Sequence, residues 1–97
     1  MDDSDLNGAI VAAIGQTAAP HVDKARLIAL YGEVEGGQIT AAVLALVQEA
    51  NAMQIGWGDL TLVQGVNDTM ARFRKLHPDL SVEALREIGR CVGWNWR

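Results

Sequence analysis

The sequence has no lysine or arginine between Leu27 and Ala71, although acidic residues occupy five positions in this stretch. They are Glu33, Glu35, Glu49, Asp59 and Asp68. A long stretch of one charge sign bears on the partners of a protein more than on its fold. We therefore expect a partner with a basic surface, and the overall acidity disfavours direct binding to nucleic acid.

Cysteine is scarce as well, since Cys91 is the only one in 97 residues, and this excludes an internal disulfide. The start of the chain is acidic where a secretory signal needs basic residues. No apolar run approaches the length of a membrane span. Together these absences predict a cytoplasmic location in a reducing compartment, away from membranes.

Aromatic residues make up only 5% of the chain, so the core must be built from aliphatic side chains and alanine. Hydrophobic residues make up 49% and charged residues 21%, an ordinary globular composition that excludes a disordered chain. The length allows one hydrophobic core and is too short for a second. We expect a single domain over residues 1–97.

The net charge of −4 conceals a division along the chain. Residues 1–68 carry nine acidic residues against Lys24 and Arg26, which leaves that part at −7. Residues 69–97 carry six basic residues against three acidic ones, which leaves that part at +3. The pattern predicts an acidic side and a basic side on one small domain.

The hydrophobic period is helical throughout and predicts an all-α bundle of about five helices. The first helix is expected to open at Ser4 or Asp5, and Pro20 ends its register. The second has Asp23 in its first turn and stops at Gly36-Gly37.

The third helix, from about Gln38 to Gln54, is apolar nearly all round. Such a helix is typically buried in the middle of a bundle. The stripe of the helix before it includes Leu30 and Val34, which we expect to face the same core.

The last two helices are joined by a turn that contains proline. Asp59 is expected to cap the first of them, and Gly65 could divide that helix in two. Ser81 is expected to cap the last helix, with Gly93 as the residue just past its end. That ending would fold Trp94 back over the core.

The segment Ala71–Asp79 is a basic helix end followed by His77-Pro78-Asp79. It resembles the loop of J-domain co-chaperones, in which a basic helix leads into His-Pro-Asp and another helix follows. The resemblance covers under a third of the chain and implies contact with an Hsp70 partner through Arg72, Arg74, Lys75, His77, Pro78 and Asp79. The alternative is that Pro78 simply breaks a helix, while Asp79 and Ser81 act as caps.

Two tryptophans, Trp94 and Trp96, stand beside Arg97 at the end of the sequence. Tryptophan and arginine are the residue types most enriched at binding hot spots, and chain ends fray unless they are tied down. We expect Trp96 and Arg97 to contribute to an interface and Trp94 to close the core. The alternative is that the tryptophans, with Trp57, all fill a core that is short of aromatics.

Residues that could do chemistry are scattered along the chain. His21 and His77 share no ligand-like neighbours, so no metal site is expected. Cys91 falls in the last turn of a helix, away from the N-terminus that would stabilise a thiolate. Glu33 and Glu35 point to different sides of a helix end and do not make an acid–base pair. We expect no catalytic and no cofactor-binding residues.

In size, acidity and lack of a catalytic set, the chain resembles the small acidic inhibitors that phages encode against host defence, anti-CRISPR proteins among them. Those proteins often block a channel that binds nucleic acid, where carboxylates imitate phosphates electrostatically. The resemblance implies a non-enzymatic inhibitor that docks an acidic surface on a basic site of a larger complex. The expected contact residues are Glu33, Glu35, Glu49, Asp59, Asp68, Trp96 and Arg97. The alternative is a helical adaptor that joins its acidic side to the basic side of a similar domain.

Overall fold

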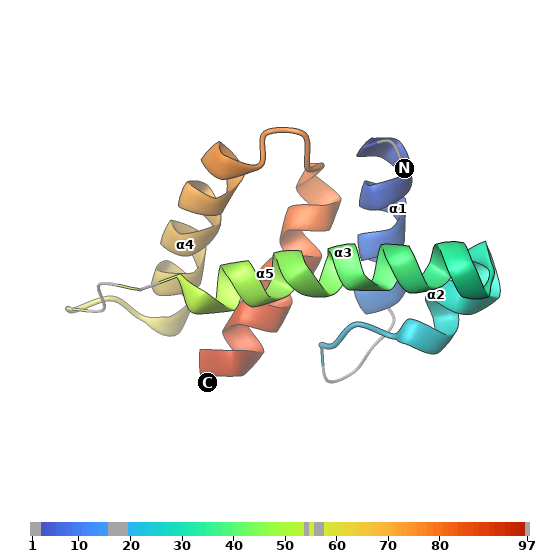
Figure 1. Cartoon of the computed structure of the whole chain (residues 1–97). Helices are drawn as coiled ribbons and strands as arrows, with labels where there is room; N and C mark the ends of the chain where they lie inside the picture. The colour runs from blue at the N-terminus through green and yellow to red at the C-terminus, as the bar shows by residue number, and fades with distance from the viewer. Residues whose placement is uncertain (1–2, 16–19, 54, 56–57, 97) are drawn as a thin grey trace.

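The structure is a computed structural model that describes residues 3–15, 20–53, 55 and 58–96. Five α-helices account for most of these residues, as the hydrophobic period predicted, and they form one all-α bundle. Their bounds are α1 Asp3–Ile14, α2 Lys24–Tyr31, α3 Glu33–Ala52, α4 Leu62–Leu76 and α5 Val82–Trp96. Figure 1 shows α3 lying across the bundle, with α4, α5 and α1 side by side along it and α2 folded back at its start.

The break between α2 and α3 falls at Gly32, four residues before the predicted stop. Gly32 has a φ of +90°, a value that residues with side chains rarely adopt. Its N–H donates the last hydrogen bond of α2 to the Ile28 carbonyl at 2.8 Å. Gly36 lies inside α3, where an added Cβ would come within 2.8 Å of the Ile28 Cα atom. The glycine pair was wrongly predicted to end a helix, because Gly36 instead lets α2 and α3 pack closely.

The N-terminus of α2 is capped by Asp23, whose carboxylate accepts a hydrogen bond from the Arg26 N–H at 3.1 Å. Asp23 therefore precedes the helix and does not lie in its first turn. The α1 helix begins at Asp3, ahead of both residues predicted to open it. Local composition thus placed both helices correctly and missed their first residues by one or two positions.

A capping box opens α4, and the prediction that Asp59 would cap this helix was wrong. The Thr61 hydroxyl accepts a hydrogen bond from the Gln64 N–H at 3.1 Å, and the Gln64 side chain accepts one from the Thr61 N–H at 2.9 Å. Gly65 is buried within this helix, which continues unbroken to Leu76. Thr69 is buried one turn later, and its hydroxyl donates a hydrogen bond to the Gly65 carbonyl at 3.0 Å.

The final helix begins as predicted and ends later than predicted. The Ser81 hydroxyl accepts a hydrogen bond from the Ala84 N–H at 3.1 Å, so Ser81 caps the helix. The helix then runs through Gly93 to Trp96, and Trp94 is exposed instead of folding over the core. An added Cβ at Gly93 would lie 3.8 Å from Val66, so this glycine sits where α4 crosses α5.

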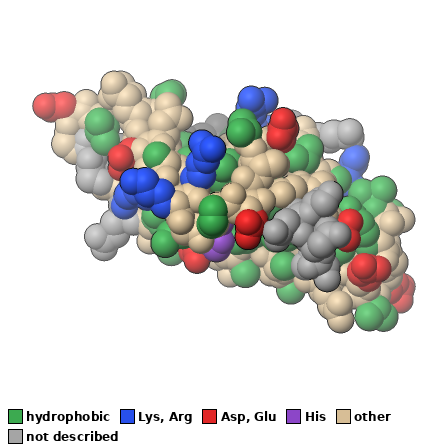
Figure 2. Space-filling model, turned by 90° about the horizontal axis from the view of Figure 1, so that it is seen from above, with side chains coloured by type: hydrophobic (Ala, Val, Ile, Leu, Met, Phe, Trp, Pro, Cys, Tyr) green, Lys and Arg blue, Asp and Glu red, His purple; other side chains and the backbone are tan. Residues whose placement is uncertain are grey.

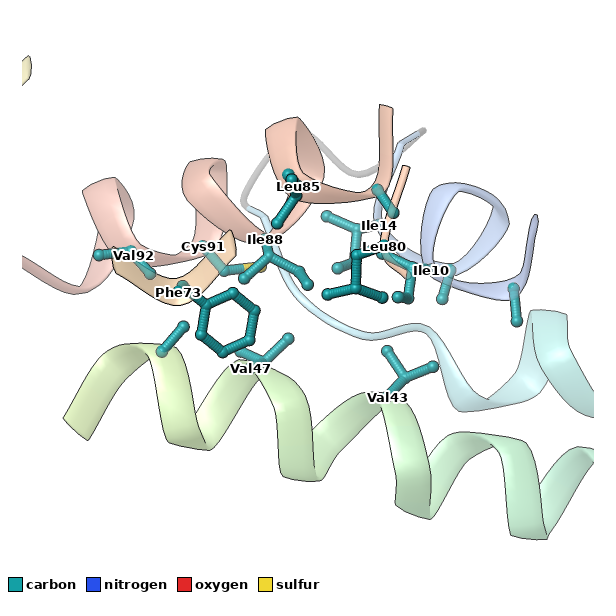
Figure 3. Packing of buried hydrophobic residues seen from close by; sticks show 14 of the residues in the cluster. Ile10, Ile14, Val43, Val47, Phe73, Leu80, Leu85, Ile88, Cys91 and Val92 are labelled. Atoms are coloured by element: carbon teal, nitrogen blue, oxygen red, sulfur yellow. The ribbon is translucent and has the colours of Figure 1, made fainter. Parts of the chain in front are cut away.

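The core lies between α1, α3, α4 and α5 (Figure 3), and Leu27 joins it from α2. Phe73 is its largest fully buried side chain, and Val47 of α3 and Ile88 of α5 lie near its ring. The α3 helix touches all four other helices, so its central position was predicted correctly. It is not buried all round, however, because Val34 and Leu44 on its outer side face solvent.

Candidate protein-binding site

Two of the five acidic residues singled out in the sequence lie together at one end of the molecule. Glu33 and Glu35 are both exposed in the first turn of α3, where negative charge suits the helix dipole. Within the part of the chain that the structure describes, neither carboxylate has an ion-pair partner. Their charge is therefore directed at solvent and is available to a partner.

The other three acidic residues are dispersed. Glu49 lies sixteen positions after Glu33 on the same helix, which separates them by about 24 Å along its axis. Glu49 pairs with His77, and Asp68 pairs with Arg72 at 3.4 Å one turn along α4. Asp59 is exposed in the connection before α4. The fold does not gather the five into one patch.

Hydrophobic side chains accompany the first pair of carboxylates. Leu30, at the end of α2, is 59% exposed, and Val34, at the start of α3, is 78% exposed. Both were wrongly predicted to face the core. The Gly32 break turns the chain at this point, so that Leu27 enters the core while Leu30 and Val34 remain outside.

We call Leu30, Glu33, Val34 and Glu35 the acidic end. Figure 2 shows acidic and hydrophobic side chains at the end of the molecule where α2 meets α3, and basic side chains over α4 toward the other end. At the acidic end, Gly32 permits the turn through its φ of +90°, and Gly36 packs against the backbone of α2. Exposed apolar residues rimmed by charge are typical of a protein-binding surface.

The two terminal tryptophans do not form a shared face. Trp94 and Trp96 are both exposed in the last turn of α5. Because the chain is helical here, two residues that are two positions apart are rotated by about 200° around the helix axis and lie on nearly opposite sides. Trp57 and Arg97 lie outside the described residues.

A groove between α4 and α5 was not foreseen from the sequence. It has a volume of about 430 Å³, and Val66, Met70, Leu85 and Gly89 lie along it. Arg86 and Arg90 line the same hollow from α5. We call it the α4–α5 groove. The signal for it was Gly89, whose lack of a side chain lets the Met70 side chain approach the α5 backbone.

The His-Pro-Asp tripeptide lies in the turn between α4 and α5, and its residues hold this turn in place. His77 hydrogen-bonds Glu49 of α3, and its ring centroid lies 4.5 Å from that of Phe73. Asn7 of α1 donates to the Asp79 carbonyl at 3.0 Å. Arg74 and Lys75 are exposed in the last turn of α4.

The titratable groups form no metal cluster among the described residues, because no three His, Cys, Asp or Glu side chains converge there. Cys91 is buried in α5, and this burial raises the pKa of its thiol to about 11. The neighbouring Arg90 opposes that shift and Glu87 adds to it. At neutral pH the thiol is protonated, as befits a small core residue.

None of the described helices is both long and apolar enough to cross a membrane. Comparison with known proteins found no match: no family model, no curated protein and no solved structure is significantly similar to this chain.

Proposed function

We propose that this chain is a non-enzymatic protein-binding domain that docks its acidic end on a basic site of a larger protein. The observation that carries the proposal is the pairing of two exposed aliphatic side chains, Leu30 and Val34, with two carboxylates that have no ion-pair partner among the described residues, Glu33 and Glu35. Such a surface supplies apolar area for affinity and charge for orientation and rate.

The close packing of α2 on α3 behind the acidic end supports the same proposal. A surface that is already ordered loses little conformational entropy when it binds. Gly36 packs against the α2 backbone, and the Leu27 side chain anchors α2 in the core. The acidic end can therefore bind without refolding.

Inhibition follows if the basic site is one that holds nucleic acid. Two carboxylates on a rigid helix end present negative charge to lysine and arginine side chains that otherwise contact phosphates. The apolar pair adds contacts that a nucleic acid backbone lacks. We include a cytoplasmic, anti-CRISPR-type inhibitor in the proposal as its most specific form.

The proposal is tested by charge reversal in a capture experiment. The tagged chain, with or without Glu33→Arg/Glu35→Arg, is used to capture proteins from a lysate of its native host, and the captured proteins are identified by mass spectrometry. The control, Asp59→Arg/Glu83→Arg, makes the same change in net charge outside the acidic end. We expect a partner that the wild type and the control capture and that the acidic-end variant does not.

Binding to the captured partner is then measured against salt concentration. Affinity should fall as salt rises, and the acidic-end variant should lose most of that dependence. The neutral variant Leu30→Ser/Val34→Ser should bind at least about tenfold more weakly with the salt dependence retained. Equal binding by the wild type and both acidic-end variants would overturn the proposal.

The His-Pro-Asp turn favours one second candidate, an Hsp70 co-chaperone. The tripeptide lies between two antiparallel helices, with Arg74 and Lys75 exposed before it. Its histidine is already engaged by Glu49, which weighs against a free recognition loop. Stimulation of an Hsp70 ATPase that is lost in His77→Gln is the result that this candidate requires.

A further inference from the structure

The α4–α5 groove has no role in the function proposed above, although its composition is that of a binding site. Val66, Met70, Leu85 and Gly89 give it an apolar lining, and Arg86 and Arg90 add positive charge. We infer that this groove binds the acidic end of a second copy of the chain. Leu30 and Val34 would enter the apolar part, and Glu33 would meet the arginines.

The charges in the groove match those of the acidic end. Arg86 is exposed and has no ion-pair partner in the part of the chain that the structure describes. Arg90 is held in place, since its Nη1 atom donates to the Glu87 carboxylate at 2.6 Å. One arginine is thus available and the other is pre-oriented. Arg86 supplies the charge that meets an incoming carboxylate, since Arg90 shares its charge with Glu87.

The apolar lining also suits aliphatic side chains of modest size. The groove is open to solvent, and Met70 and Val66 pack closely against Gly89 along its floor. Two exposed aliphatic side chains that project from a helix junction can enter such a hollow, whereas the side chains of a flat surface cannot. The acidic end combines such aliphatic side chains with negative charge.

The groove and the acidic end of one molecule cannot reach each other. The molecule measures 45 × 27 × 19 Å, and α4 and the α2–α3 junction lie at opposite ends of its length (Figure 1). Docking is therefore intermolecular, and it joins two different surfaces. Such a contact is head-to-tail and can be repeated from copy to copy.

The contact is small, so the association is weak. A hollow of about 430 Å³ takes few side chains, and stable interfaces bury about 1,200–2,000 Å² in total. We expect a dissociation constant of about 0.1–1 mM at low salt. This inference uses the same acidic end as the proposed function, but it requires only the purified chain and no foreign partner.

The experiment is sedimentation equilibrium of the wild type and two half-inactivated variants at low salt. Leu30→Ser/Val34→Ser removes the apolar part of the acidic end and leaves the groove intact. Arg86→Glu repels an acidic ligand from the groove and leaves the acidic end intact. Lys75→Glu is the control, because it makes the same change in charge on α4 away from the groove residues.

The wild type and Lys75→Glu should increase in average mass with concentration up to about 1 mM, while each half-inactivated variant stays monomeric. An equal mixture of the two variants should form dimers and nothing larger, since it contains one working surface of each kind. A monomeric wild type over that range would overturn the inference. So would unchanged association of Arg86→Glu, or a mixture that fails to dimerise. None of these results depends on the capture experiment, so the two proposals can fail separately.

Discussion

Asn7 accepts a hydrogen bond from the backbone N–H of Ser81 at 2.8 Å, across 74 positions of the sequence. The same side chain donates to the Asp79 carbonyl at 3.0 Å. One amide thus ties α1 to the turn that joins α4 and α5. Because α4 packs mainly on α5, this link helps to fix the pair of helices that forms the α4–α5 groove.

Replacing Asn7 by alanine should lower the free energy of unfolding by about 1–3 kcal/mol, because the partly buried Ser81 N–H loses its partner. Asn7→Asp keeps the acceptor and loses only the donor to Asp79, so it should cost less. Urea unfolding followed by circular dichroism measures both. Equal stability of the alanine variant and the wild type would show that water replaces this amide fully.

Phe73 should be the most sensitive position in the core. Its side chain is fully buried, so Phe73→Ala should cost about 3–5 kcal/mol of unfolding free energy, through lost burial and the cavity left behind. Leu76, one turn later on the same helix, is exposed, and Leu76→Ala should change stability by no more than about 0.5 kcal/mol. Similar losses for the two variants in urea unfolding would contradict this packing.

Gly32 and Gly37 should respond oppositely to alanine. Gly32 has a φ of +90° and a ψ of 167°, a region nearly confined to glycine, so Gly32→Ala should cost about 1–3 kcal/mol. Gly37 lies in α3 with no heavy atom within 4 Å of an added Cβ, so Gly37→Ala should stabilise by up to about 1 kcal/mol. Thermal unfolding of both variants distinguishes the two effects. A destabilised Gly37→Ala would place the helix boundary after this residue.

The thiol of Cys91 should react slowly in the folded protein. Burial raises its pKa to about 11, so its thiolate population near pH 8 should be about 100-fold smaller than in the unfolded chain. The rate of reaction with a small aromatic disulfide, with and without denaturant, measures this protection. A native rate equal to that of the denatured chain would mean that Cys91 is accessible.

The same pKa shift has a definite effect on stability. The thiol of Cys91 ionises at a lower pH in the unfolded chain than in the folded one. Its contribution to the free energy of unfolding is therefore complete below about pH 8.5 and falls as the pH rises toward 11. A Cys91→Ala variant should lack this part of the alkaline loss. Unfolding midpoints compared between pH 8 and 10 would show an identical decline for both proteins if the thiol had no such role.

The sequence predicted the features that depend on neighbouring residues. The helical class followed from the hydrophobic period, and Ser81 was identified as a cap from the residues around it. Cys91 was expected in the core and lies there. Such features are encoded within one or two helical turns, where composition alone constrains the backbone.

Features that depend on distant segments could not be predicted. Gly36 and Gly93 look like helix stops, but each is helical because another helix packs against it. The pairing of Glu49 with His77 joins α3 to the end of α4 across 28 positions. Because of this contact, the Glu49 carboxylate is engaged within the molecule, although the sequence showed it as part of one acidic stretch. Of the exposed carboxylates that remain, Glu33 and Glu35 lie together in one helical turn, while Asp59 lies apart from them before α4.

We propose that the acidic end is the surface by which this chain binds its partner. Amide hydrogen exchange, followed by mass spectrometry with and without the captured partner, locates the residues that the partner covers. We predict slower exchange on binding in residues 28–36, with α1 and the α4–α5 turn unchanged. Protection confined to α4 and α5, with residues 28–36 exchanging as in the free chain, would contradict the claim.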